Sequence, residues 1–238
     1  MTDAFFEIHS SLDREGPGDR DSLDWALELA RVPKDARILD AGCGPGADIA
    51  GLLHHAPEGH VTALDSHAPF IDAVRARHAG DSRVTAEVAD MLAADGPFDL
   101  IWCAGAVYFA GVTEALTAWT PRLTGSKIVA FSQLAWKSSD RPTEAAAFWA
   151  EGYPPMTDRD GVLTQVQEAG YRIVAARFLP DAAWEAYYTP LGRRVAFLRS
   201  GEVPDDLAEA LDAEEREMAL WRAHRDAFGY LQVVATPE

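Results

Sequence analysis

Short apolar runs alternate with amphipathic stretches through the middle of this 238-residue chain, and no other feature limits its fold as strongly. Five apolar runs predict strands, at residues 36–41, 60–65, 83–88, 98–104 and 126–132. Three stretches between them predict helices, at about residues 46–55, 68–79 and 112–119. Strands joined by helices of this length form right-handed crossovers, which place the strands parallel in one sheet. The sequence therefore predicts an α/β fold with helices on both faces of the sheet.

The chain changes character after residue 132. Further elements are predicted there, namely helices at about 142–151 and 158–169, a strand at 171–178, helices across 181–227 and a closing strand at 229–235. We expect the helices of 181–227 to be interrupted near Pro190 and Pro204, because proline removes a helical N–H donor. The acidic segment 202–217 is interpreted as a surface helix with a solvated face.

Charge and cysteine content narrow the functions open to the chain. With 38 acidic and 21 basic residues, the net charge is −17. This balance argues against binding to nucleic acid or to an anionic membrane, both of which need clustered Lys and Arg. The cysteines, Cys43 and Cys103, form no zinc pattern, and the histidines form no spaced set, so we expect no metal. Without a signal peptide or an apolar span, a cytoplasmic location is expected.

A glycine-rich loop, Asp40-Ala41-Gly42-Cys43-Gly44-Pro45-Gly46, stands between the first predicted strand and the helix after it. Glycines let a ligand approach the backbone closely, and the following helix offers free N–H groups. Asp65 ends the second strand, where its carboxylate can accept both hydroxyls of a ribose. Asp90 and Met91 follow the third strand and suit an adenine amino group and ring. Ligands bind at these carboxyl ends in open α/β sheets, so the features predict one nucleoside site.

Two ligand classes fit a glycine loop followed by a strand-end acid. A nicotinamide cofactor usually requires GxGxxG, whereas this loop reads GxGxG. No Tyr has Lys four residues on, as a short-chain dehydrogenase would require. S-adenosylmethionine needs a ribose acid, an adenine contact and a place for its amino-acid end, and Asp40 with the loop backbone suits the last role. S-adenosylmethionine is thus favoured, and a nicotinamide-dependent reductase remains the weaker alternative.

These motifs resemble those of the class I S-adenosylmethionine-dependent methyltransferases. ILDAGCGPG at 38–46 is similar to their first motif, ALD at 63–65 to their ribose-binding acid and AD at 89–90 to their adenine contact. FDLIWCAGAVYF at 98–109 and RLTGSKIVAFS at 122–132 resemble their fourth and fifth strands. The resemblance implies a Rossmann-like sheet of seven strands, closed by GYLQVV as an antiparallel seventh strand, with helices on both faces and a helical lid.

A narrower resemblance, to a group of bacterial small-molecule methyltransferases, extends along nearly the whole chain. It is carried by FFEIHSSLDREGPGD at 5–19, Trp149 with Tyr153-Pro154, and Trp184 with the YYTPL stretch at 187–191. We expect a single domain over residues 1–238. Its expected parts are an N-terminal segment over the cofactor (1–19), a core (20–132, 158–178 and 228–238) and lid or acceptor-site insertions (133–157 and 179–227).

The resemblance implies S-adenosyl-L-methionine as cofactor and S-adenosyl-L-homocysteine as product. The residues expected to contact the cofactor are Arg14, Asp40, Gly42, Cys43, Gly44, Gly46, Asp65, Ser66, Asp90, Met91 and Ala104. Arg14 is expected to pair with the carboxylate of the methionine part. Aromatic residues of the lid are expected at the acceptor site, namely Trp136, Trp149, Tyr153, Tyr187 and Tyr188. Aromatics suit a flat or cationic acceptor, or else form the core of the lid.

Methyl transfer is an in-line displacement that depends mainly on positioning, and a base is needed only for a protonated acceptor. Tyr108 and His9 are the candidate catalytic residues, although His9 could instead be exposed or cap a helix, and Tyr108 could be a packing aromatic. The predicted function is methyl transfer to a small-molecule acceptor. The alternative is a non-catalytic cofactor-binding or acidic interaction protein on the same fold. The acceptor, the methylated atom and the oligomeric state stay open, with a homodimer as the candidate assembly.

Overall fold

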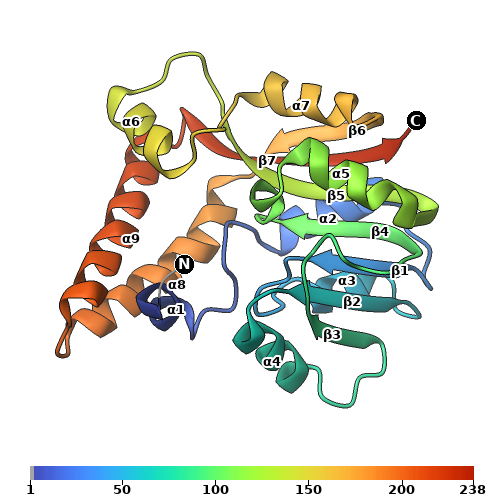
Figure 1. The fold of residues 1–238 in the computed structure, drawn as a ribbon, viewed down its shortest axis with the longest axis horizontal. Helices are drawn as coiled ribbons and strands as arrows, with labels where there is room; N and C mark the ends of the chain where they lie inside the picture. Colours follow the sequence, from blue (N-terminus) through green and yellow to red (C-terminus); the bar gives the residue numbers. More distant parts are fainter. Residues whose placement is uncertain (1–2) are drawn as a thin grey trace.

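The computed structural model describes residues 3–238, which form one mixed sheet with helices on both faces and a helical lid at one end (Figure 1). The seven strands are β1 Arg37–Ala41, β2 His60–Asp65, β3 Val84–Val88, β4 Phe98–Ala104, β5 Leu123–Trp136, β6 Tyr171–Phe178 and β7 Phe228–Pro237. The α-helices are α1 Asp3–His9, α2 Arg20–Ala30, α3 Ile49–His55, α4 Ala68–Arg77, α5 Val112–Trp119, α6 Thr143–Gly152, α7 Arg159–Glu168, α8 Asp181–Arg199 and α9 Asp205–His224.

The strands lie in the order β3-β2-β1-β4-β5-β7-β6. The first five strands pair in parallel, whereas β7 is antiparallel to both β5 and β6. The strand order reverses beside β1, so the carboxyl ends of β1 and β4 diverge there and leave a crevice for a ligand. The predicted seven-strand sheet with an antiparallel last strand is confirmed.

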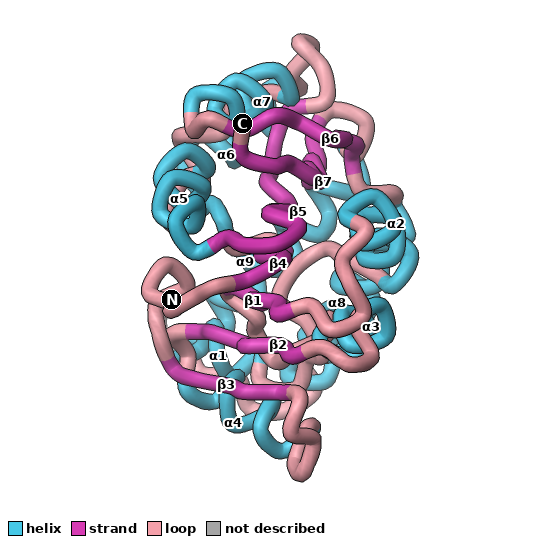
Figure 2. The backbone as a smooth tube through the Cα atoms, turned by 90° about the vertical axis from the view of Figure 1, so that its right-hand side faces the viewer, coloured by secondary structure: helices cyan, strands magenta, loops and turns pink. Residues whose placement is uncertain are grey.

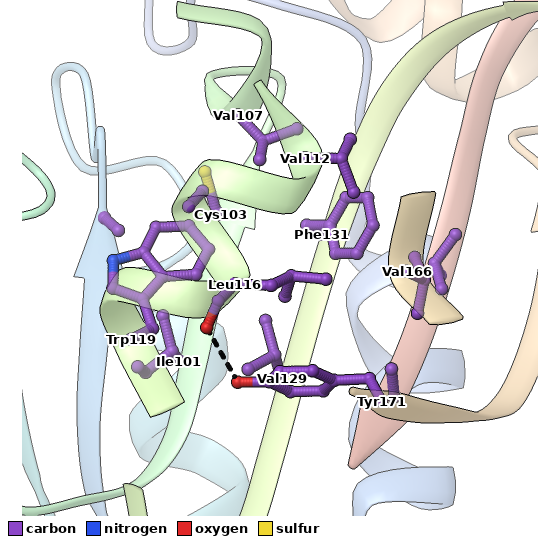
Figure 3. Packing of buried hydrophobic residues seen from close by; sticks show 14 of the residues in the cluster. Ile101, Cys103, Val107, Val112, Leu116, Trp119, Val129, Phe131, Val166 and Tyr171 are labelled. Carbon is purple, nitrogen blue, oxygen red and sulfur yellow. Dashed lines mark hydrogen bonds between the residues drawn. The ribbon is translucent and has the colours of Figure 1, made fainter. Parts of the chain in front are cut away.

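Helices lie on both faces of the sheet (Figure 2), and an apolar cluster of buried side chains lies on each face. Helices α5 and α7 pack on one face, where Ile101, Val129 and Phe131 of the sheet meet Leu116 and Val166 (Figure 3). Helices α2, α3 and α4 pack on the other face through Leu27, Leu52 and Val74, among others. Because both faces are buried, the central strands are almost wholly apolar, as parallel strands usually are.

A third apolar cluster packs α1, α6, α8 and α9 against the carboxyl end of β5 and the start of β7. Trp184 of α8 and Trp221 of α9 stack with ring centroids 5.0 Å apart and are almost fully buried. This cluster forms the core of the lid.

The sequence prediction differs from the structure at Pro190. Helix α8 runs from Asp181 to Arg199 through this residue instead of breaking there. Because proline has no N–H, the carbonyl of Ala186 lacks its usual helical donor at Pro190. Both residues are exposed, so water can donate to that carbonyl instead. The break falls instead just before Pro204, which precedes α9 as predicted.

Candidate active site

A cavity of about 710 Å³ opens at the carboxyl ends of β1, β2 and β4. Its lining includes ten of the residues predicted to contact the cofactor, namely Arg14, Asp40, Gly42, Cys43, Gly44, Asp65, Ser66, Asp90, Met91 and Ala104. The N-terminal segment contributes Phe5, Phe6, Glu15 and Gly16 to the same cavity, and the segment after β4 contributes Gly105 and Tyr108. Residues far apart in the sequence are thus gathered at the edge where parallel strands end.

The glycine loop has the close packing that glycine alone permits. Gly42 has φ +71°, and a Cβ on it would lie 2.5 Å from the Cβ of Ala106. Gly46 has φ +84°, and a Cβ there would lie 2.8 Å from a methyl carbon of Val74. Gly46 is therefore packed under the loop against α4, whereas Gly42 lies at the cavity surface. Larger side chains would displace the backbone from the ligand space.

The carboxylates that follow β2 and β3 are fixed by backbone donors. Gly44 N–H donates to Oδ2 of Asp65 at 2.9 Å, and His67 N–H donates to its Oδ1 at 2.8 Å. Leu92 N–H donates to Oδ1 of Asp90 at 2.7 Å. Each carboxylate oxygen has more than one lone pair, so these oxygens can still accept hydroxyl or amino hydrogens from a ligand. The geometry suits a nucleoside.

Asp40 is 3% exposed, and its Oδ2 has no hydrogen-bond partner among residues 3–238. Burial, with the charges of Asp48 and Asp65, raises the pKa of Asp40 well above its usual range. A buried acceptor without a hydrogen bond lowers the stability of the fold unless a ligand donates to it. Asp40 thus offers a place for a cationic or N–H-bearing group, as the amino end of S-adenosylmethionine provides.

The segment that carries Arg14 folds over this cavity. Arg14 Nη2 donates to Oδ1 of Asp48 at 2.7 Å, while Trp102 Nε1 donates to the other oxygen of Asp48 at 3.0 Å. Phe6 of α1 stacks on His67 with ring centroids 3.6 Å apart. The guanidinium therefore lies in the cavity but already has an acidic partner.

His9 is 1% exposed, so the expectation of an exposed histidine is wrong. Its Nδ1 lies 2.6 Å from Oε2 of Glu15, and its Nε2 lies 3.2 Å from Oε1 of Glu214 on α9. Burial alone would lower the pKa of His9, but these two carboxylates overcome it and raise the pKa from 6.5 to about 9. At neutral pH His9 is an imidazolium held between two acids, and it fastens α1 to the lid.

Tyr108 lies in the short 3₁₀ turn after β4 and lines the cavity. Its ring centroid is 5.9 Å from that of Tyr153. Gln133 Nε2 donates to the Tyr153 hydroxyl at 3.0 Å. Tyr108 and Tyr153 thus stand together on the side of the cavity that faces the lid.

The other aromatics predicted at the acceptor site lie in the core of the lid. Trp136 and Trp149 both pack against Phe228. The rings of Tyr187 and Tyr188 are tilted to each other with centroids 5.3 Å apart, and Tyr188 is fully buried. None of these four residues is in the cavity lining.

The sequence analysis missed two acids of α9 that face inward. Glu214 contacts His9, and Glu217 accepts a hydrogen bond from the Tyr188 hydroxyl at 2.8 Å. The segment was interpreted as having a solvated acidic face, yet these two residues fall at helical spacing from the buried Leu211, Met218 and Trp221. That spacing was the signal that could have identified them.

Within residues 3–238, no cluster of three or more His, Cys, Asp or Glu side chains could hold a metal ion. No helix in the same range combines the length and the apolar character needed to cross a membrane.

Residues 38–123 match a family described as a methyltransferase domain. Malonyl-[acyl-carrier protein] O-methyltransferase of Pseudescherichia vulneris is 30% identical over 159 residues, which cover 62% of this chain and 62% of that protein. Trans-aconitate 2-methyltransferase of Streptomyces avermitilis is 34% identical over 125 residues, or 48% of this chain and 46% of that protein. The chain thus spans less than two thirds of the length of these curated relatives.

One solved structure is similar along the whole chain. It is a SAM-dependent methyltransferase from Geobacter sulfurreducens in complex with S-adenosyl-L-homocysteine, with a TM-score of 0.83 and 18% identity, and the match covers 100% of this chain and 99% of that one. At this identity the likeness concerns the fold. Together with the methyltransferase domain matched over residues 38–123, this shared fold supports the resemblance inferred from the motifs.

Proposed function

We propose that this chain transfers a methyl group from S-adenosylmethionine to a small-molecule acceptor by in-line displacement. The observation that carries the proposal is the single cavity in which the glycine loop, Asp65, Asp90 and Tyr108 meet. The relatives' names and the complex with S-adenosyl-L-homocysteine support the same cofactor and reaction. The homodimer and the cytoplasmic location stay predictions.

Each part of the cavity has a role in holding the cofactor. Asp65, fixed by two backbone donors, would accept the ribose hydroxyls, and Asp90 with Met91 would contact adenine. Asp40 would accept from the amino group of the methionine part, since its Oδ2 has no other partner. Arg14 would approach the methionine carboxylate while it remains paired with Asp48. When bound, S-adenosylmethionine supplies an electrophilic methyl group on a sulfonium.

The charge of the cavity suits a cationic ligand. Six carboxyl groups of residues 3–238 line it, from Glu15, Asp40, Asp48, Asp65, Asp90 and Glu114, and burial raises the pKa of Asp40 and of Glu15 among them. The same part of the chain contributes one arginine, Arg14, and no lysine to the lining. Opposite charges attract strongly where burial limits screening. We infer that the site favours the sulfonium cofactor electrostatically.

The two predicted catalytic residues have different roles in this proposal. Burial, with the nearby Glu217 charge, raises the pKa of Tyr108, so this hydroxyl stays protonated at neutral pH and can orient an acceptor as a donor. Both ring nitrogens of His9 are engaged by Glu15 and Glu214. His9 is therefore a positioning residue that holds α1 over the cavity instead of a base.

Calorimetry tests the proposal directly. We expect S-adenosylmethionine and S-adenosylhomocysteine to bind at micromolar concentration and NADH not to bind. Asp65→Ala should weaken S-adenosylhomocysteine binding by about 1.5–3 kcal/mol, as loss of hydrogen bonds to a charged group does. Asp72→Ala on α4 removes an exposed carboxylate and is the matched control.

Three results would contradict or redirect this assignment. Binding of NADH alone would support the reductase alternative. An unchanged affinity in Asp65→Ala would remove Asp65 from the ribose site. Binding of the cofactor without methylation of any acceptor would favour the non-catalytic alternative.

A further inference from the structure

Three tyrosines surround the side of the cavity that faces the lid. Tyr108 and Gly105 belong to the cavity lining, and Tyr153 lies against Tyr108. A methyl group placed on Gly105 would lie 3.8 Å from Cε1 of Tyr230, so the Tyr230 ring lies next to this part of the cavity lining. We call Tyr108, Tyr153 and Tyr230 the tyrosine box. Ring faces at such spacing can stabilise a cation that comes within about 6 Å.

Glu217 supplies a negative charge beside the tyrosine box. Burial and the neighbouring Glu214 raise the pKa of Glu217 from 4.5 to about 7. Burial is the largest cause that raises the pKa of Tyr108, and the Glu217 charge is the second. The Glu217 charge also raises the pKa of Tyr230. Ring contacts connect this carboxylate to the tyrosine box. Tyr188, which donates to Glu217, lies 5.4 Å from Trp184 between ring centroids, and Trp184 lies 5.4 Å from Tyr230.

Glu217 has no cationic partner of its own. Its one hydrogen bond within residues 3–238 comes from the Tyr188 hydroxyl, and it takes part in none of the ion pairs formed there. The nearby His9 is already held by Glu15 and Glu214. A half-buried carboxylate without an ion pair becomes more favourable when a cation pairs with it.

Gln133 provides a second, independent sign of a missing donor. This residue, at the carboxyl end of β5, is 2% exposed. Its Nε2 donates to the Tyr153 hydroxyl and to the Leu134 carbonyl, whereas its Oε1 has no hydrogen-bond partner in the described part of the chain. Within residues 3–238, the group around the tyrosine box thus holds a carboxylate without an ion pair and an amide oxygen without a hydrogen bond.

We propose that the methyl acceptor is an amine whose ammonium group pairs with Glu217 and whose carbon groups lie against the tyrosine box. This inference rests on the proposed methyl transfer and adds the substrate class to it. The curated relatives bear names of carboxylate-containing acceptors, malonyl and aconitate. An acceptor of that kind would meet the like charge of Glu217 here, so this pocket has the opposite preference.

The chemistry of an amine fits the groups present. An ammonium must lose a proton before its nitrogen can act as a nucleophile, and Glu217 receives that proton. The nitrogen lone pair then forms the bond to the methyl carbon while the carbon–sulfur bond breaks and its electron pair stays on sulfur. The methylated ammonium carries one positive charge, and the sulfur becomes neutral, so charge is conserved.

Three probes of similar size distinguish the classes, namely benzylamine (cation), benzyl alcohol (neutral) and benzoate (anion). Each is titrated by calorimetry into the full chain saturated with S-adenosylhomocysteine, which permits no turnover. We expect benzylamine to bind most tightly and benzoate most weakly. Glu217→Gln should weaken benzylamine binding by about tenfold or more, as loss of a charged partner does, and leave S-adenosylhomocysteine affinity unchanged. Glu209→Gln, an exposed acid on the same helix, should change neither.

Each outcome supports or overturns a stated claim. Failure of the wild-type chain to bind S-adenosylhomocysteine overturns the proposed function, and this inference with it. Normal cofactor binding with equal or absent binding of the three probes, or with a preference for benzoate, overturns the amine proposal alone. Unchanged benzylamine affinity in Glu217→Gln removes Glu217 from the pocket. If that variant loses its fold, the order of the three probes on the wild-type chain still decides.

Discussion

The cofactor side and the lid side of the cavity are held by different kinds of contact. At the cofactor side, backbone N–H groups fix Asp65 and Asp90, and the donors lie at most 21 residues away in sequence. At the lid side, side chains from distant segments bind one another, as His9 does with Glu214 across 205 residues. The first region is specified by local sequence, and the second only by the packing of α1, α8 and α9 (Figure 1).

This difference has an energetic consequence. Backbone donors keep Asp65 in place as long as the strand–loop–helix units persist, whatever the lid does. The charges of the lid region depend on one another, because removal of one partner leaves another buried without compensation. We therefore expect mutations in the lid to affect stability first, and mutations in the sheet to affect stability and cofactor binding together.

The largest expected effects come from two buried tryptophans, Trp221 of the lid and Trp119 of α5, each 0% exposed. Either change to alanine should cost about 3–5 kcal/mol in the free energy of unfolding, because each leaves a large cavity. Trp119 Nε1 also donates to the Met91 carbonyl at 3.1 Å, beside the predicted adenine contact. Trp119→Ala should therefore also weaken S-adenosylhomocysteine binding, whereas Trp221→Ala should alter it little.

Urea unfolding and calorimetry measure the two quantities separately. Phe197→Ala on α8 is the control for removal of an aromatic ring, since Phe197 is 67% exposed. A large loss of cofactor affinity in Trp221→Ala would show that the lid and the cofactor side are coupled more tightly than their contacts suggest.

Much of the sheet and the cofactor side was predictable, because their signals are local. Strand periodicity, the glycine loop and acids at strand ends each occupy a few consecutive residues, and parallel topology brings them to one edge. The cavity accordingly gathers Gly42, Asp65 and Asp90. The lid was less predictable. Whether Trp136 and Trp149 belong to the core of the lid or to the acceptor pocket depends on which helices pack on them, and the sequence does not show that.

His9 and Glu217 show a further limit of prediction from sequence. A histidine in an N-terminal segment carries no local sign that two glutamates, one of them 205 residues away, will bury it. The pairing arises only when α1 packs between α8 and α9. Ionisation states in the lid region therefore follow from tertiary contacts.

An intermediate effect is expected at His9, whose folded pKa of about 9 exceeds its ordinary 6.5. The protonated His9 ring therefore contributes its full stabilisation below about pH 6.5, and this contribution is lost as the pH rises through about 9. The His9 ring faces Glu15 and Glu214, with Phe5 stacked on it and Tyr187 beside it. His9→Gln should cost on the order of 1–3 kcal/mol of stability at pH 6 and progressively less toward pH 10.

Denaturant unfolding of both proteins across this pH range tests the sign. His54→Gln on α3 replaces an exposed histidine and should give a difference from wild type that does not change with pH in this way. A difference for His9→Gln that grows as pH rises would mean that His9 is neutral in the fold, and the attachment of α1 to the lid by an imidazolium would be wrong.

The smallest effect tests whether the cofactor covers the glycine loop. Cys43 lines the cavity, and burial raises the pKa of its thiol, so alkylation by iodoacetamide should be slow but measurable. Saturation with S-adenosylhomocysteine should slow it several-fold, while NADH should not. Cys103, which is 0% exposed, serves as the internal reference, because its labelling reports opening of the whole fold. Peptide mapping by mass spectrometry separates the two thiols. Equal protection of both would mean that the ligand acts by stabilising the fold, and equal Cys43 rates with and without ligand would place the cofactor away from the loop.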